Sequence, residues 1–216
     1  MNLEDARAQM LGQQLRAWEV LDDRVLTVLR ETPRELFVPD AYRELAFADM
    51  DIPLAHGQQM MAPKVEGRLL QALDPDSTDG ILEIGTGSGF LTACLSRLAG
   101  NVISLDIFAD FVRDAKPRLD QLGIDNVELR AEDAMAFSPG QQFDTIAVTG
   151  SVPELDDHFI RMLRPGGRLF VIVGREPVMD ARMITLHPNG EWTQDSLFET
   201  VVPPLLNAER PEPFVL

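Results

Sequence analysis

Hydrophobic positions in the first 75 residues of the chain recur mostly at helical spacing. Residues 3–18 place apolar side chains at steps of one, three or four, which predicts an amphipathic helix. A second helix is predicted from about Asp22, a suitable N-cap, through Leu29, and Pro33 stops it. Residues 33–63 hold several prolines and few periodic positions, so we expect mostly ordered loop there, followed by a third helix at about 63–73.

From residue 80 onward, apolar runs of strand length alternate with helical patterns. Such alternation predicts βα units, and their apolar strands imply a parallel, doubly wound sheet covered on both faces. The expected strands are residues 81–84, 102–105, 127–130, 143–149 and 168–173, and the expected helices are residues 90–98, 108–122 with a kink or early break at Pro117, and about 153–163.

The last 40 residues change character. Residues 183–186 and 192–201 flank Pro188-Asn189-Gly190, which is a turn signal for an antiparallel hairpin. The tail from Asn207, with Pro211 and Pro213, shows no core pattern. We therefore expect an α/β fold in two parts, with a helical and loop lobe at residues 1–77 and a nucleotide-binding core at residues 78–216.

A glycine loop separates the first strand of this core from its helix. The loop reads Gly85-Thr86-Gly87-Ser88-Gly89, and Asp106 ends the following strand. In such a βαβ unit one glycine makes the tight turn, the next lets the backbone approach a ligand, and the last allows close packing of helix on strand. A carboxylate at position 106 can accept hydrogen bonds from both hydroxyls of a ribose.

Two details refine the kind of ligand. Phe90 stands where a dinucleotide-binding loop would have its third glycine, and Glu83 precedes the loop, where it could meet an ammonium group directly or through water. An acid there suits an adenosyl cofactor that carries an amino acid better than one that carries a pyrophosphate. The pattern resembles the S-adenosylmethionine (SAM) site of Rossmann-like methyltransferases. The alternatives are NAD, or a glycine turn that only packs a strand on a helix.

The resemblance assigns the cofactor contacts residue by residue. We expect them at Glu83, Gly85, Thr86, Gly87, Ser88, Asp106 and Asp133. Asp133 follows the third strand, where a carboxylate can accept from an adenine amino group. His158 and His187 have no metal-ligand spacing to other His or Cys residues, so no metal site is predicted.

Composition restricts which binding partners and which cellular compartment we expect for this chain. The net charge is −16, from 35 acids and 19 bases, and such a balance opposes non-specific binding to nucleic acid. No apolar run approaches the ~20 residues of a membrane span, and the N-terminus does not resemble a signal peptide. The single cysteine, Cys94, agrees with a reducing cytoplasm, and its apolar surroundings favour a buried packing role.

Motifs in the N-terminal lobe resemble one methyltransferase family. They are Gln13-Gln14-Leu15-Arg16-Ala17, Asp23-Arg24-Val25-Leu26, Pro33-Arg34-Glu35-Leu36-Phe37-Val38-Pro39, Ala41-Tyr42, Pro53-Leu54, Gly57-Gln58 and Ala62-Pro63, followed by LEIGTGSG at 82–89, Phe143-Asp144 and Pro165-Gly166-Gly167. In this order they resemble protein-L-isoaspartate O-methyltransferases over roughly residues 8–175. The resemblance implies a Rossmann-like methyltransferase fold and SAM-dependent methylation of the free carboxylate of isoaspartyl residues in damaged proteins.

The chain departs from this family in one loop. Family members have a Thr-Ile-Ser run after Gly-Gln, and that serine hydroxyl contacts the substrate carboxylate. Here the run is Gln59-Met60-Met61, and a thioether cannot donate a hydrogen bond. His56 and Gln58 of the same loop could supply donors, so His56, Gln58 and Met61 are the candidate catalytic positions, although His56 also fits a surface loop and the two methionines fit core packing.

Three functions therefore stay open at this point. The first is a repair methyltransferase of the isoaspartyl type. The second has the same core but a small-molecule or peptide acceptor, because Met61 replaces the serine. The third is a SAM-binding protein without catalysis. No nucleic acid or membrane partner is expected, and the sequence does not choose between a monomer and a homodimer.

Overall fold

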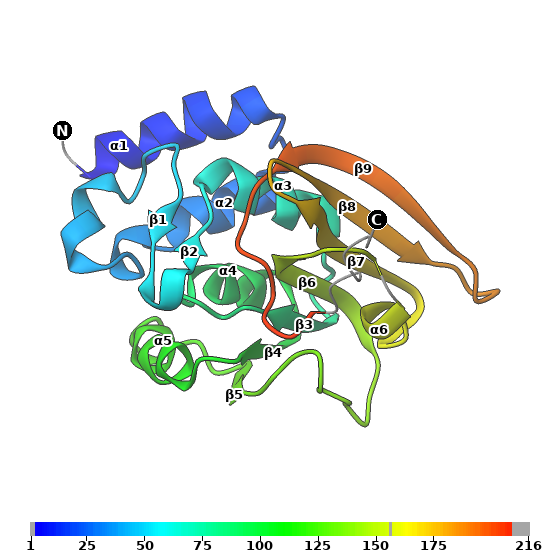
Figure 1. The fold of residues 1–216 in the computed structure, drawn as a ribbon. Coiled ribbons are helices and arrows are strands. Elements are labelled where there is room, and N and C mark those ends of the chain that lie inside the picture. Colours follow the sequence, from blue (N-terminus) through cyan, green and yellow to red (C-terminus); the bar gives the residue numbers. More distant parts are fainter. Residues whose placement is uncertain (1–2, 156, 209–216) are drawn as a thin grey trace, which may run out of the picture.

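A seven-stranded sheet forms the centre of the molecule (Figure 1). The computed structural model describes residues 3–155 and 157–208. Strand order is β5-β4-β3-β6-β7-β8-β9; the pairs from β5 to β7 are parallel, and the last two are antiparallel. The strands are β3 (Gly80–Ile84), β4 (Asn101–Asp106), β5 (Val127–Ala131), β6 (Phe143–Val152), β7 (Leu163–Arg175), β8 (Val178–Leu186) and β9 (Trp192–Thr200). The mostly parallel sheet with a C-terminal antiparallel hairpin is thereby confirmed.

One face of the sheet carries most of the helices. They are α3 (Pro63–Leu73), α4 (Phe90–Leu98) and α5 (Ala109–Gln121), with α2 (Asp23–Glu31) packed on α3 and α4. The Asp22 side chain accepts from the main-chain N–H of Arg24 at 2.7 Å and caps α2 as predicted. The first helical stretch begins as α1 (Leu3–Gln9) and continues as a π-helical segment (Met10–Leu15) and a 3-10 turn (Arg16–Trp18). Apolar residues from all these helices form one buried cluster with the sheet.

The opposite face is covered by less regular structure. The helix predicted over residues 153–163 is shorter than expected, because β6 extends to Val152 and β7 begins at Leu163, which leaves α6 (Asp157–Ile160) between them. Phe137, from the connection between β5 and β6, packs with Phe159 of α6 against this face. Strand β3 is buried on both sides, since Ile81 belongs to the first cluster and Leu82 and Ile84 belong to the second.

Residues 33–63 are mainly loop, as predicted, with short regular pieces. They include 3-10 turns at Arg34–Leu36, Asp40–Leu45 and Ala55–Gly57, and an antiparallel ribbon of β1 (Ile52–Pro53) and β2 (Gln59–Met60). In this ribbon Ile52 pairs with Met60, so the Gln-Met-Met run follows a turn that is closed by backbone pairing.

The structure corrects the expected break in the helix at Pro117, and it does not describe the proline-containing tail. Helix α5 runs through Pro117 to Gln121 instead of breaking there. Arg113, whose carbonyl loses its partner at this proline, lies on an exposed part of the helix. The prolines of the tail, Pro211 and Pro213, lie outside the described residues. The division of the chain at residues 77 and 78 stays a prediction, and the first cluster of buried residues spans both parts.

Candidate functional site

A cleft lies where the chain reverses its winding direction, at the carboxyl ends of β3, β4 and β6. In open α/β sheets ligands bind at this switch point. The cleft encloses about 750 Å³ of empty space, its open mouth included. The lining residues are Leu54, Gln58, Gln59, Met61, Ile84, Gly85, Gly87, Leu105, Asp106, Ile107, Phe108, Phe111, Glu132, Asp133, Ala134, Thr149, Gly150 and residues 202–206.

The glycine loop forms the floor of this cleft. Gly85, Gly87 and Gly89 have φ values of 99°, 49° and 87°, a region that side chains disfavour. A Cβ atom on Gly85 would lie 2.1 Å from the Thr149 hydroxyl oxygen, and one on Gly89 would lie 2.9 Å from the Ala115 Cβ on α5. Glycine at 85 therefore keeps the bare backbone against the cleft, and glycine at 89 lets α5 pack closely.

Asp106 lies at the end of β4 and faces the same space. Its Oδ2 atom accepts from the main-chain N–H of Gly87 at 2.8 Å, and its Oδ1 atom accepts from that of Phe108 at 2.9 Å. Burial raises the pKa of this carboxyl, although both backbone donors oppose the shift. Each carboxylate oxygen can accept more than one hydrogen bond, so Asp106 retains acceptor capacity for a ligand.

Asp133 follows β5 and lines the cleft together with Asp106. Its Oδ1 atom accepts from the main-chain N–H of Met135 at 2.9 Å, and its Oδ2 atom accepts from the side-chain amide of Asn207 at 2.7 Å. The bond to Asn207 ties the connection after β5 to the segment that follows β9. Asp133 thus lines the same cleft as Asp106, Gly85 and Gly87. The contact of these four residues with a cofactor stays a prediction.

The other three predicted cofactor residues are buried; Glu83 lies at the end of β3, and Thr86 and Ser88 belong to the glycine loop. Glu83 has no exposed surface, and its Oε2 atom accepts from the hydroxyls of Thr92 and Ser104. Thr86 is buried and bonds to the Ser104 hydroxyl at 2.6 Å, while the Ser88 hydroxyl accepts from the main-chain N–H of Phe90 at 3.3 Å. Among the described residues that line the cleft, none of these three is found. Their contact with a cofactor stays a prediction.

A loop from the N-terminal part faces the glycine loop across the cleft. We call residues 54–61 the acceptor loop. Gln58 and Met61 line the cleft as candidates, and Gln59 lines it beside them. The Gln58 amide donates to the carbonyl of His56 at 3.4 Å, and the Gln59 amide donates to that of Val201 at 3.5 Å. Both bonds are long, so both amides can turn toward a ligand.

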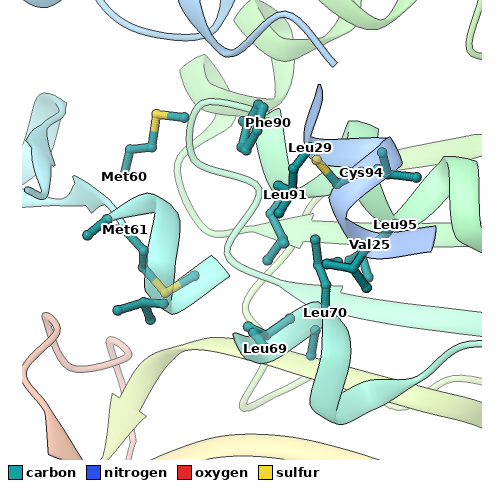
Figure 2. Close-up of a cluster of buried hydrophobic side chains, with 14 of the residues drawn as sticks. Val25, Leu29, Met60, Met61, Leu69, Leu70, Phe90, Leu91, Cys94 and Leu95 are labelled. Atoms are coloured by element: carbon teal, nitrogen blue, oxygen red, sulfur yellow. The ribbon is translucent and has the colours of Figure 1, made fainter. Parts of the chain in front are cut away.

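Met60 and Met61 project to opposite sides of the chain (Figure 2). Both are almost fully buried and belong to the core cluster that includes Phe90 and Leu91 of α4. Met61 is the one that lines the cleft. The two methionines thus pack against the core as expected, and Met61 gives the acceptor side an apolar surface.

A buried arginine fixes the acceptor loop from the core side. The Arg34 guanidinium donates to the carbonyls of Met61 at 2.6 Å and Ala46 at 2.8 Å, and it pairs with the carboxylate of Glu66. Burial raises the pKa of Glu66 to about 7 against the opposing effect of Arg34. Because the guanidinium bonds to Glu66 of α3 and to the carbonyls of Ala46 and Met61, it ties residue 61 to α3 and to the loop that contains Ala46.

His56 lies at the rim of the cleft, where its side chain contacts Phe108 and Asp110. Its ring stacks on Phe108 with centroids 4.1 Å apart, and its Nε2 atom lies 2.8 Å from Oδ2 of Asp110 on α5. This bond holds the pKa of Asp110 below its usual range. Since Phe108 lines the cleft, His56 joins the acceptor loop to the opposite half of the site. His56 is not among the described lining residues, so a role as substrate donor stays a prediction.

Residues 202–206 form a wall of the cleft that the sequence did not predict. The main-chain N–H of Ser151 donates to the carbonyl of Pro203 at 3.0 Å, and the carbonyl of Ser151 accepts from the main-chain N–H of Leu205 at 2.8 Å. These bonds lay the segment beside the end of β6. Thr149 was also missed; its hydroxyl donates to the carbonyls of Ile84 at 2.9 Å and Gly85 at 3.2 Å. A segment without periodicity gives no signal of its own, although Pro203-Pro204 does exclude a helix interior.

Nowhere in residues 3–155 and 157–208 do three His, Cys, Asp or Glu side chains gather as a metal site would need. In the same part of the chain, no helix has the length and apolarity to cross a membrane.

Comparison with known proteins gives a consistent result over nearly the whole chain. The family model for protein-L-isoaspartate (D-aspartate) O-methyltransferase matches residues 6–210. A protein-L-isoaspartate O-methyltransferase 2 of Pelobacter propionicus is 34% identical over 211 residues, which cover 96% of this chain and 93% of the relative. A protein-L-isoaspartate O-methyltransferase of a Caulobacter species is also 34% identical, over 94% of each chain.

Solved structures agree on the fold. A Plasmodium falciparum structure, assigned as a protein-L-isoaspartate O-methyltransferase in complex with S-adenosyl-L-homocysteine, superposes with a TM-score of 0.78 at 22% identity. The match covers 91% of this chain and 96% of the other.

Proposed function

This chain belongs to the protein-L-isoaspartate (D-aspartate) O-methyltransferase family, and we propose that its cleft binds SAM and methylates the isoaspartyl carboxylate of damaged proteins. One observation carries the proposal most directly. The glycine loop with Asp106 and the acceptor loop with Gln58, Gln59 and Met61 line the same cleft. A cofactor half and an acceptor half therefore meet in one space.

The cofactor half fits SAM in its donor and acceptor groups. Asp106 offers carboxylate oxygens for the two ribose hydroxyls, and Asp133 offers one for the adenine amino group. Ile107 and Phe108 supply apolar surface between these two acids for the purine ring. Gly85 and Gly87 leave the backbone bare where the amino-acid portion would lie. SAM supplies an electrophilic methyl group on a sulfonium; a carboxylate oxygen forms the new C–O bond as the S–CH₃ bond breaks, and the bonding pair stays on sulfur.

The chain's own contribution to this reaction is orientation and exclusion of water. The acceptor loop is held on two sides, by Arg34 in the core and by the contact of His56 with Phe108 and Asp110. Residues 202–206 close a third side. A dry, preorganised site favours a step in which a cationic donor and an anionic acceptor lose their charges together.

The acceptor half needs donors in place of the serine hydroxyl that position 61 lacks. The amides of Gln58 and Gln59 are the candidates, because both side chains line the cleft and make only long bonds within the protein. We assign them to the substrate carboxylate. Met61 then serves as an apolar wall that keeps water from this carboxylate.

The test is transfer of labelled methyl from SAM to a peptide with one isoaspartyl residue, measured as base-labile methyl ester. The same peptide with normal aspartate is the control. Isoaspartate-dependent turnover is the expected result. SAM binding without turnover on this peptide would overturn the assignment of the acceptor.

A further inference from the structure

The first helical stretch runs along the outside of the molecule (Figure 1), and a hollow lies between it and α2. The hollow encloses about 650 Å³ of empty space, its open mouth included, and it shares no lining residue with the cleft. Three of its lining residues are arginines, namely Arg7, Arg16 and Arg30. Positive charge is scarce in this chain, which has 19 bases and 35 acids. Three guanidinium groups around one hollow therefore need an explanation.

Arg7 is the fixed member of this group. Its side chain is buried, and its guanidinium donates to the carboxylate of Glu35 at 2.7 Å and to that of Glu4, which also lines the hollow. Arg7 therefore has its counterions inside the protein, and it holds one wall of the hollow in place. Two carboxylates against three guanidinium groups leave one net positive charge, which belongs to Arg16 and Arg30.

Arg16 and Arg30 come from the two elements that enclose the hollow. Arg16 directly follows the π-helical segment, and Arg30 lies in the last turn of α2. Both residues are exposed, and within residues 3–155 and 157–208 neither guanidinium makes a hydrogen bond or an ion pair. Two guanidinium groups that line one space without a counterion attract an anion.

The backbone beside Arg16 is unusual as well. Met10–Leu15 is a π-helical segment, and this rare geometry is frequent at functional sites. Gly12 of this segment lines the hollow, and a Cβ atom there would meet nothing within 4 Å. Packing therefore does not require a glycine at this position, and glycine weakens a helix relative to alanine. A need for open space above the backbone explains why the residue is glycine.

We propose that this hollow binds a phosphate-bearing small molecule through Arg16 and Arg30. One guanidinium fork uses both oxygens of a carboxylate, whereas a phosphate group offers three acceptor oxygens and can bond two forks at once. Leu11 and Leu26 add buried apolar side chains to the lining, which suits the organic part of such a molecule.

The phosphate belongs to a free molecule and not to a polymer or a membrane. The net charge of −16 opposes approach to nucleic acid and to anionic lipid surfaces, whereas a small anion can enter the hollow alone. Because the hollow lies outside the cleft, this site goes beyond the proposed function and does not rest on it.

The test is titration of the whole protein with phenyl phosphate and with inorganic phosphate, followed by NMR through the amide signals of Leu11 and Gly12. Sodium chloride at the same ionic strength is the control, because chloride screens charge and cannot bridge two guanidinium forks. We expect saturable shifts with both phosphates, and tighter binding of phenyl phosphate because its ring can contact Leu11 and Leu26. No saturable shift, or the same shift with chloride alone, would overturn the proposal.

Arg16→Gln and Arg30→Gln should each weaken phenyl phosphate binding by about tenfold, because each removes charged hydrogen bonds to the phosphate. Arg97→Gln is the matched control. Arg97 is an exposed arginine of α4, outside the lining of the hollow, and its side chain makes no hydrogen bond or ion pair in the described part of the chain. R97Q should bind as the wild type does, and unchanged binding in both R16Q and R30Q would overturn the proposal.

Gly12→Gln should raise the melting temperature, because glutamine forms helices better than glycine, and it should weaken phenyl phosphate binding by filling the hollow. These opposite changes separate a binding role of Gly12 from a loss of structure. Sedimentation with phosphatidylglycerol vesicles, without a response to the free phosphates, would overturn the assignment to a small molecule. Methyl transfer in the cleft is measured separately, so failure of this site leaves the proposed function intact.

Discussion

The guanidinium of Arg34 donates to the main-chain carbonyl of Met61 at 2.6 Å from a position with almost no exposed surface. Met61, which stands where the family has a serine, is thus anchored through its backbone carbonyl by a charged side chain in the core. The side chain at position 61 can differ between proteins without moving this anchor, because the bond uses the carbonyl.

Arg34→Ala should destabilise the fold by about 3–5 kcal/mol, because it leaves the carboxyl group of Glu66 buried without its partner. Urea unfolding monitored by circular dichroism measures the effect. The double variant Arg34→Met with Glu66→Met should regain part of this loss, since two apolar side chains need no partner while the carbonyls of Ala46 and Met61 still lose their donor. A double variant no more stable than R34A would contradict this explanation of the pair.

Asp106→Ala should weaken SAM binding by about 1–3 kcal/mol, because the ribose hydroxyls lose their acceptor. Calorimetric titration with SAM gives the value. Asp125→Ala is the matched control, an exposed acid beyond α5 and outside the cleft lining, and it should bind SAM as the wild type does. Unchanged affinity in D106A would remove the ribose assignment.

Met61→Ser should raise the methylation rate of an isoaspartyl peptide by tens- to hundreds-fold, because it returns a hydroxyl donor worth about 2–4 kcal/mol to the acceptor half. The same change should lower the free energy of unfolding by about 2 kcal/mol, since Met61 is buried. Met60→Ser is the matched control: it should lose comparable stability without a gain in rate, because Met60 projects to the other side (Figure 2). A rate gain in both variants would argue against a specific donor at position 61.

The free energy of unfolding should fall as pH rises from about 4.5 to about 8. Burial raises the pKa of Glu83 to about 8, so Glu83 keeps its proton in the folded state over this range and loses it in the unfolded chain. Below this window the carboxyl group is protonated in both states, and above it the loss is complete. We expect the Glu83 contribution to reach up to about 5 kcal/mol. Urea unfolding of wild type and E83Q at about pH 5 and pH 8 measures it, and the pH dependence should be weaker in E83Q. Equal pH dependence in both proteins would refute the buried-proton explanation.

A weaker pH dependence of the same sign should remain in E83Q, because the pKa of Glu66 is also raised, to about 7.

His56→Ala should loosen the acceptor loop by removing the stack on Phe108 and the bond to Asp110. Faster hydrogen exchange of the acceptor-loop amides and a KM for SAM raised a few-fold are the expected results. His187→Ala, at the exposed hairpin, is the control and should change neither. A fall in kcat at unchanged KM would instead point to His56 as a donor in the reaction.

Much of the fold was predictable because strands and helices differ in hydrophobic period. The β3 run at residues 81–84, the loop glycines and the cap at Asp22 each gave a local signal that the tertiary structure kept. The face of β3 on which the Glu83 side chain lies could also be predicted. Side chains alternate along a strand, so Glu83 lies on the same face as Ile81, toward the helices. The contact with a ligand's ammonium group was predicted for Glu83 only because it stands close to the glycines in the sequence. That prediction did not take the alternation of side chains into account.

The missed parts depend on contacts between distant segments. Residues 202–206 form a cleft wall only because Ser151 bonds to them, and the long-range bond of Asn207 to Asp133 has no sequence pattern. Arg34 was recognised as part of a motif, but its bonds to Ala46 and Met61 require the loop to be folded. Such features arise from packing, and no period or spacing in the sequence encodes them.

The wall at residues 202–206 also orders events during synthesis. In a chain made from its N-terminus, β3 with its glycine loop and β6 are translated before this segment, since all of them precede it in the sequence. The sheet can therefore assemble around a cleft that is still open on one side. The closing wall is added after the cofactor half, so the growing chain acquires the ability to shield a reaction from water later than the glycine loop and Asp106.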